Sequence, residues 1–171
     1  MSHSIDVSDT HQVFNQPAPL QDYNAYQADE VLQYWVQQFG GHWGDSKLAS
    51  FGHQIGHELL QAGFQANKHL PEFQPHNRFG QRVDQVDYHP AYHQLMSHAV
   101  QNGHCSFAWT ENKPGAHVIR GAMAFLHNHA DPGSGCPLTM TFASVPAISV
   151  QPDIAAKWLP KILSGHYDGT N

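Results

Sequence analysis

The sequence predicts an all-α fold, an irregular bundle of about six helices that follows an extended N-terminal arm. Three observations lead to this prediction. Apolar residues recur at helical spacing in several segments, glycine and proline separate these segments, and no segment shows the apolar–polar alternation of a half-buried strand. A chain of 171 residues is long enough for one domain with its own core. We therefore expect an arm over 1–26 that packs on a surface, and one helical domain over 27–171.

The composition is that of a folded and mildly polar protein, with 40% hydrophobic and 13% charged residues. A formal net charge of −6 argues against nucleic acid or an anionic membrane surface as a partner. No stretch of about 18 apolar residues could span a membrane, and the first residues do not resemble a secretory signal. A cytoplasmic protein is therefore expected. The 15 histidines make its charge sensitive to acidification.

The first two helices are predicted from apolar residues three and four positions apart. The spacing predicts a helix over 29–39, which Asp29 can cap at its start and a glycine pair ends. A second helix is expected over 46–63. Gly52 and Gly56 lie four residues apart in this helix, so one of its faces lacks side chains at these two positions. Because glycine within a helix costs about 1 kcal/mol, we expect another helix to approach closely there.

Four further helices are predicted after a loop over 68–88 that proline and glycine interrupt. Proline opens one of these helices, and another ends before an Asp-Pro pair, because the residue before proline disfavours the helical conformation. The last should be kinked or split by Pro160. These four helices are expected over about 90–103, 117–131, 135–148 and 152–163.

The segment Gly135–Ile148, GCPLTMTFASVPAI, is almost uncharged and rich in threonine and small residues. Four residues could face a core, while other faces stay narrow and mildly polar: Leu138, Phe142, Val145 and Ile148. Threonine and serine can return their hydroxyls to backbone carbonyls, which makes such a helix tolerable in apolar surroundings. The residues alone leave two readings open, an ordinary core helix and one wall of a cavity.

No self-contained active site is evident in the sequence. His53 and His57 lie four positions apart on one helical face and are weak candidates for a metal site. Glu58 follows the second histidine, so the order differs from the H-E-x-x-H motif of zinc proteases. Cys105 lies next to His104, but sequence neighbours rarely face each other, so a structural cysteine is expected rather than a nucleophile.

Several segments together resemble one family. VFNQPAPLQDYNAY, FGQRVDQVDYHPAYHQLM, AMAFLHNHADPGSGCPLTMTFASVPAI and WLPKILSGHYD are similar, in this order and spacing, to the N-terminal part of the adaptive-response protein AidB, a branch of the acyl-CoA dehydrogenase flavoproteins. The resemblance covers about residues 13–168. It implies the N-terminal helical domain of that superfamily.

The resemblance also implies which parts of the complete protein this chain contains. Complete members bind FAD in a middle domain and carry the catalytic glutamate later still, and both regions lie beyond the matching part. We therefore expect no cofactor on this chain alone, no catalytic residue, and either self-association or a flavin-domain partner. The helix that matches Gly135–Ile148 lines the substrate cavity in the superfamily, so the resemblance places five residues on the cavity wall: Thr139, Met140, Thr141, Ala143 and Ser144.

Three functional hypotheses follow. The first is a non-catalytic module that acts by assembly and forms a cavity wall, encoded as a fragment, a split gene or a domain on its own. The second is a subunit of a split FAD-dependent acyl-CoA dehydrogenase. The third is a histidine-rich metal-binding module.

Overall fold

The computed structural model describes residues 14–170, and residues 1–13 of the predicted arm lie outside this part. The described chain is mainly helical, which confirms the all-α prediction, and one small antiparallel sheet is added to the helices. Its elements are α1 (Glu30–Gln38), η1 (His42–Gly44), α2 (Asp45–Gln54), η2 (Ile55–Leu59), α3 (Leu60–Lys68), β1 (Glu72–His76), β2 (Arg82–Asp87), α4 (Pro90–Gln101), α5 (Phe107–Thr110), α6 (Ala116–Ala130), α7 (Gly135–Ser149) and α8 (Pro152–Ile162).

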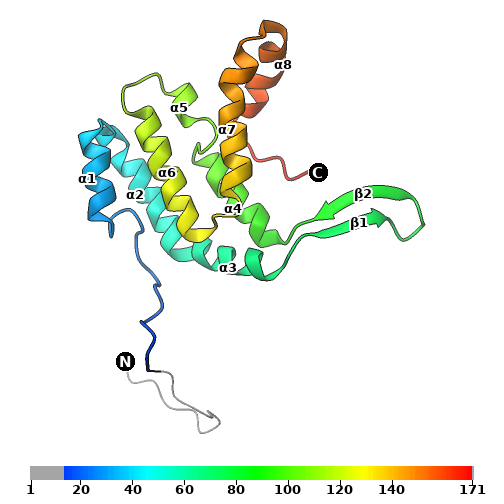
Figure 1. Ribbon diagram of the computed structural model, residues 1–171, viewed down its shortest axis with the longest axis horizontal. Coiled ribbons are helices and arrows are strands. Elements are labelled where there is room, and N and C mark those ends of the chain that lie inside the picture. The colour runs from blue at the N-terminus through cyan, green and yellow to red at the C-terminus, as the bar shows by residue number, and fades with distance from the viewer. Residues whose placement is uncertain (1–13, 171) are drawn as a thin grey trace.

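Helix α6 runs through the middle of the bundle, between α1 and α2 on one side and α7 on the other (Figure 1). The main core lies where α6 meets the long helix formed by α2, the π-helical turn η2 and α3. Its fully buried large side chains include Leu48, Phe51, Ile55, Leu59, Leu95, Ile119, Met123 and Leu126. A second and smaller cluster, Ala99, Cys105 and Leu138, joins α7 to α4.

Most helix boundaries agree with the sequence prediction. Asp29 caps α1, because its Oδ1 accepts a hydrogen bond from the Leu32 N–H at 2.8 Å. Pro90 opens α4 as expected. The second helix does not end at Gly63 but continues to Lys68, and Gly63 allows close packing there because it lies directly against the carbonyl of Ala130 in α6. Helix α8 is not split at Pro160.

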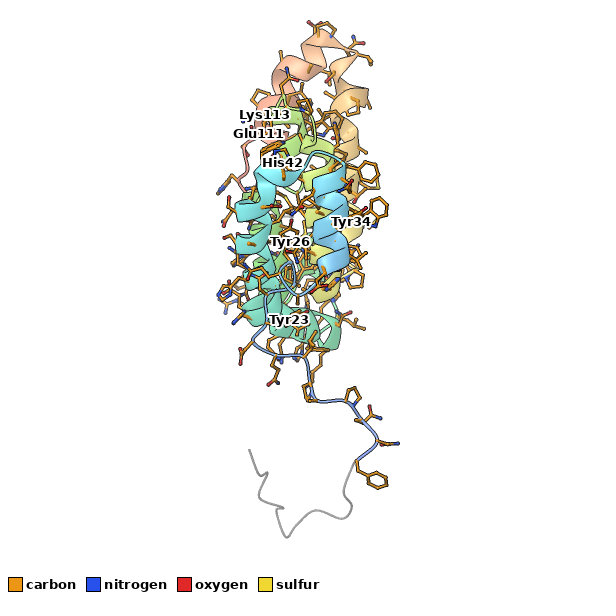
Figure 2. The ribbon with its side chains drawn as sticks, turned by 90° about the vertical axis from the view of Figure 1, so that its left-hand side faces the viewer. Tyr23, Tyr26, Tyr34, His42, Glu111 and Lys113 are labelled. Carbon is orange, nitrogen blue, oxygen red and sulfur yellow. The ribbon has the colours of Figure 1, made fainter. Side chains whose placement is uncertain are left out.

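The close approach at Gly52 and Gly56 is made by the irregular segment 23–26, which leads into a turn, so the expectation of a helix there was wrong. A side chain on Gly56 would overlap the carbonyl oxygen of Tyr23. The Ala25 N–H donates to the Gly52 carbonyl at 2.9 Å, and the Tyr26 hydroxyl donates to Asp45 at 2.6 Å. Figure 2 shows Tyr23 and Tyr26 along this side of the bundle. The preceding residues, 14–22, are exposed.

The predicted loop over 68–88 instead contains a projecting hairpin of β1 and β2 (Figure 1). Its alternation was hidden for two physical reasons. Pro75 argues against a strand because it cannot donate a ladder hydrogen bond. The pairing also shifts between Gln74 and His76, and Asp84 opposite has φ of 47°, so the bulge interrupts the period of two.

Helices α7 and α8 pack mainly on each other and extend beyond the rest of the bundle (Figure 1). No side chain of α8 is buried. In the described part of the chain, no helix is long and apolar enough to cross a membrane.

Candidate functional site

Helix α7 presents one broad exposed face. Leu138 and Val145 are buried on the side that meets the bundle. With about 100° between successive residues, Met140, Ala143 and Ser144 share the opposite face. Met140 is 67% exposed. We call these three residues the α7 face. Of the other residues assigned to a cavity wall by resemblance, Thr139 and Thr141 are also exposed but lie on the two flanks of this face.

Two hydroxyl groups on the outer side of α7 donate to carbonyls of the same helix. Thr141 Oγ1 donates to the Pro137 carbonyl at 2.9 Å, and Ser144 Oγ donates to the Thr141 carbonyl at 2.7 Å. Such bonds leave methyl and methylene groups as the outward surface of these side chains. The exposed surface of α7 is therefore apolar and uncharged, although it contains threonine and serine.

A side chain behind the exposed face replaces the backbone hydrogen bond that a proline removes from α7. Pro146 has no N–H, so the Phe142 carbonyl loses its usual helical donor. The Trp109 indole of α5 donates to this carbonyl at 3.0 Å and stacks on the Phe142 ring at 4.8 Å between centroids. The Arg120 guanidinium lies 3.9 Å from the centre of the same ring. These contacts hold α7 as one continuous helix.

A cavity of about 310 Å³ lies between α6 and α7. Two of the predicted wall residues, Thr139 and Met140, line it, whereas Thr141, Ala143 and Ser144 do not. The remaining lining includes Ala124 and Asn128 of α6, Cys136 of α7, and the buried His104. Thr139 and Met140 therefore border this cavity. Met140 also belongs to the α7 face with Ala143 and Ser144, and Thr141 lies on a flank of that face.

Two histidines are buried next to each other, which sequence reasoning did not identify. The rings of His104 and His127 lie 5.5 Å apart between centroids. Burial, helped by the nearby His127 and Arg120, lowers the pKa of His104 to about 3. Burial also lowers the pKa of His127 to about 4, although the charge of Asp131 opposes this. The one signal in the sequence is that His127 lies four residues after Met123 on the buried side of α6.

Only one nitrogen of this pair has a hydrogen-bond partner. His127 Nε2 lies 2.7 Å from Ser134 Oγ. His127 Nδ1 and both ring nitrogens of His104 are buried and have no partner among residues 14–170. An unsatisfied buried polar group destabilises a fold by about 1–3 kcal/mol. The buried pair His104 and His127 therefore lowers the stability of the fold instead of contributing to it.

The two cysteines differ in their surroundings. Burial raises the pKa of the Cys105 thiol to about 11, although Arg120 opposes this, and its Sγ lies 3.4 Å from the Leu138 carbonyl. A buried thiol with a raised pKa is a poor nucleophile. Cys105 therefore packs as a small apolar residue, as the sequence suggested, while Cys136 is exposed.

A thiol-labelling experiment should separate the two cysteines. Because the thiolate is the reactive form, a water-soluble maleimide at pH 7 should label Cys136 quickly and Cys105 only after denaturation. Mass spectrometry of the native protein should show one adduct per chain, and Cys136→Ser should show none. Rapid native labelling of Cys105 in that variant would contradict the buried position.

The candidate metal ligands His53 and His57 lie side by side, with ring centroids 4.0 Å apart. His57 Nδ1 lies 2.8 Å from the His53 carbonyl oxygen, so this nitrogen must carry a proton and donate. A protonated nitrogen cannot bind a metal ion, which leaves His57 only its Nε2. Among residues 14–170, no three His, Cys, Asp or Glu side chains are grouped so that they could hold a metal ion.

Comparison with known proteins gives one family for nearly the whole chain. The sequence model of the adaptive response protein AidB N-terminal domain matches residues 15–169. An AidB protein of Escherichia coli (strain K12), named as an acyl-CoA dehydrogenase, is 41% identical over 162 residues. That match covers 93% of this chain and 30% of the E. coli protein.

Solved structures show the same fold. The apo form of Bd2924 superposes with a TM-score of 0.81 at 23% identity, over 90% of this chain and 32% of the other. Caenorhabditis elegans ACDH-11, solved in complex with C11-CoA, gives a TM-score of 0.80 at 20% identity, over 97% of this chain and 29% of the other. This chain thus spans about a third of the length of each relative.

Proposed function

Because this chain belongs to the family of AidB N-terminal domains, we propose that it forms one helical wall of the substrate cavity of an acyl-CoA dehydrogenase-like flavoprotein and catalyses no reaction by itself. In such a protein FAD, the hydride acceptor, is held by other domains. The observation that carries the proposal is the α7 face with its flank at Thr141, an exposed helix surface without charge on which the Thr141 and Ser144 hydroxyls are bonded within the helix.

An apolar acyl chain suits this surface for a physical reason. A wall that contacts hydrocarbon should present no unsatisfied donor or acceptor, because a lone polar group there costs free energy. The Thr141 and Ser144 hydroxyls already have acceptors, so their exposed methyl and methylene groups can contact hydrocarbon without penalty. The Met140 side chain is flexible and polarisable and can adapt to chains of different shape.

Assembly is the second part of the proposal. The paired helices α7 and α8 extend from the bundle with most of their side chains exposed. Ile154 and Trp158 of α8 are large apolar side chains that remain exposed in this chain. Such surfaces are covered in the native assembly of a protein or lead to aggregation. The covering surface would be the flavin-binding part of an acyl-CoA dehydrogenase-like protein.

The proposal is tested by reconstitution. The chain alone should bind no FAD and should not oxidise an acyl-CoA; C11-CoA, the ligand of the C. elegans structure, is a suitable probe. It should bind the flavin-containing remainder of E. coli AidB, produced without its own N-terminal domain. A chain that purifies yellow with bound FAD would overturn the non-catalytic assignment. Recovery of dehydrogenation only in the mixture would favour the split-enzyme form of the hypothesis.

A charge on the α7 face should disrupt this assembly. Ala143→Asp places a carboxylate where an apolar surface is expected, and burying it unpaired should weaken the complex at least about tenfold. The matched control is Ser50→Asp on the exposed side of α2. Affinity is measured by calorimetry, and circular dichroism checks that both variants fold. Equal affinities for the two variants would show that the α7 face is not buried against the flavin-containing remainder.

A further inference from the structure

A second cavity lies where three chain connections meet, away from the α7 face. Its volume is about 160 Å³. The connection from α3 to β1, the connection from β2 to α4, and the turn between α6 and α7 all contribute to it. The α7 residues proposed as a cavity wall are not among those that line it.

Aromatic rings form much of the lining. The Tyr88 and Tyr92 rings are stacked with centroids 4.4 Å apart, and the His69 and His89 rings are stacked at 4.6 Å. His89 is fixed because its Nδ1 accepts a hydrogen bond from the Ala91 N–H at 3.2 Å at the start of α4. The faces of aromatic rings carry negative partial charge and attract cations.

A buried carboxylate completes the lining. Asp131 is only 4% exposed. It accepts hydrogen bonds from the Gly133 N–H at 3.2 Å, the Ser134 N–H at 3.0 Å and the Asn67 amide at 3.3 Å. Burial would raise its pKa, but the hydrogen bonds from Ser134, Gly133 and Asn67 outweigh burial and lower it. The carboxylate is therefore ionised at neutral pH.

The negative charge of Asp131 is not neutralised by a cation. All its donors are uncharged amides, and the ion pairs among residues 14–170 involve other carboxylates, those of Asp84, Glu58 and Glu111. His127 is close enough to feel this charge, but its pKa of about 4 keeps it neutral at pH 7. Hydrogen bonds from Gly133, Ser134 and Asn67 stabilise this charge, and its negative potential at the cavity wall can attract a cation.

We propose that this cavity binds a small organic ammonium ion of the trimethylammonium type. The cation would contact the Tyr88 and Tyr92 rings and offset the charge of Asp131. An apolar cavity of about 150 Å³ accommodates benzene, and a trimethylammonium group is no larger. Methylated ammonium ions bind to aromatic cages because their weak hydration makes them easy to remove from water. The proposal does not depend on the role of α7.

Choline and its uncharged isostere, in which carbon replaces nitrogen, provide the test. Both are titrated into the 171-residue chain at pH 8. Calorimetry measures affinity, and NMR shifts of the Tyr88 and Tyr92 ring protons locate the ligand. Choline should bind about tenfold more tightly than the isostere. Equal binding of the two would show only an apolar void, and the absence of choline binding would overturn the proposal.

Two variants test the assigned groups separately. Asp131→Asn removes the charge and keeps one oxygen, so it can retain the hydrogen bond from Gly133 on Oδ1 or the one from Ser134 on Oδ2, but not both. Tyr88→Leu removes one ring without touching the carboxylate. Each should weaken choline binding about tenfold. Tyr34→Leu, an exposed tyrosine on α1, is the control and should have no effect. If Asp131→Asn does not fold, Tyr88→Leu decides. Unchanged affinity in a folded variant of either kind would place the ligand elsewhere.

Discussion

Lowering the pH from 7 to 5 is expected to destabilise the domain by about 4 kcal/mol, because His104 and His127 must remain neutral in the fold. Their folded pKa values of about 3 and about 4 lie below the ordinary histidine value of 6.5. Between these values the unfolded chain binds more protons than the folded chain. Stability is therefore complete above about pH 6.5 and falls as the pH decreases.

The size of the effect follows from the two shifts. At pH 5 each histidine favours the unfolded chain by about 2 kcal/mol, since each pKa unit is worth about 1.4 kcal/mol. Asp131 does not add to this change, because its pKa is lowered from 3.8 and it loses its contribution only in more acidic solution. Urea denaturation at a series of pH values measures the free energy of unfolding directly.

Replacing His104 identifies the source of this pH dependence. Both ring nitrogens of His104 lack partners, so His104→Leu should raise stability at pH 7 and remove about half of the loss at pH 5. His129→Leu changes an exposed histidine of α6, the helix that carries His127, and should leave the loss as it is. A free energy of unfolding that stays constant from pH 7 to 5 would show that the two imidazoles are accessible to protons in the folded chain.

Substituting Gly63 by alanine is expected to destabilise the fold by about 2 kcal/mol or more. The added Cβ would overlap the carbonyl oxygen of Ala130, and this backbone atom cannot move without displacing α6. Helix propensity alone predicts the opposite, a gain of about 1 kcal/mol.

Gly121→Ala is the matched control, because Gly121 lies within α6 with no atom within 4 Å of an added Cβ. This variant should gain up to about 1 kcal/mol from helix propensity alone. The two substitutions are chemically identical, so the difference between their urea midpoints isolates the contact between α3 and α6. Similar midpoints for the two variants would contradict the close packing at Gly63.

The sequence was sufficient for features that depend on local chemistry. The cap at Asp29, the proline that opens α4 and the continuous apolar segment that becomes α7 all follow from residues close together in the chain. The hairpin was missed because Pro75 and the bulge opposite it remove the alternation on which strand prediction depends. Gly52 showed that something approaches α2, but spacing alone could not show that it was an irregular segment with a turn.

The candidate site could be predicted only in part for a similar reason. Resemblance directed attention to α7, and helical geometry then showed that Met140, Ala143 and Ser144 share a face. The burial of His104 could not be predicted, because it lies in a turn whose position depends on distant contacts. Among so many histidines, only the three-dimensional packing separates the buried ones from those in solvent.

The Trp109 indole, which replaces the donor that Pro146 lacks, makes α7 depend on a residue 33 positions earlier in the chain. The conformation of α7 therefore depends on Trp109, which packs behind the helix, where a ligand on the outer face would not touch it. If α7 forms the proposed cavity wall, changes at Trp109 would alter the contour of that wall while every residue on the exposed face is retained. Under the same proposal, relatives that differ only behind the helix are expected to accept different acyl chain lengths.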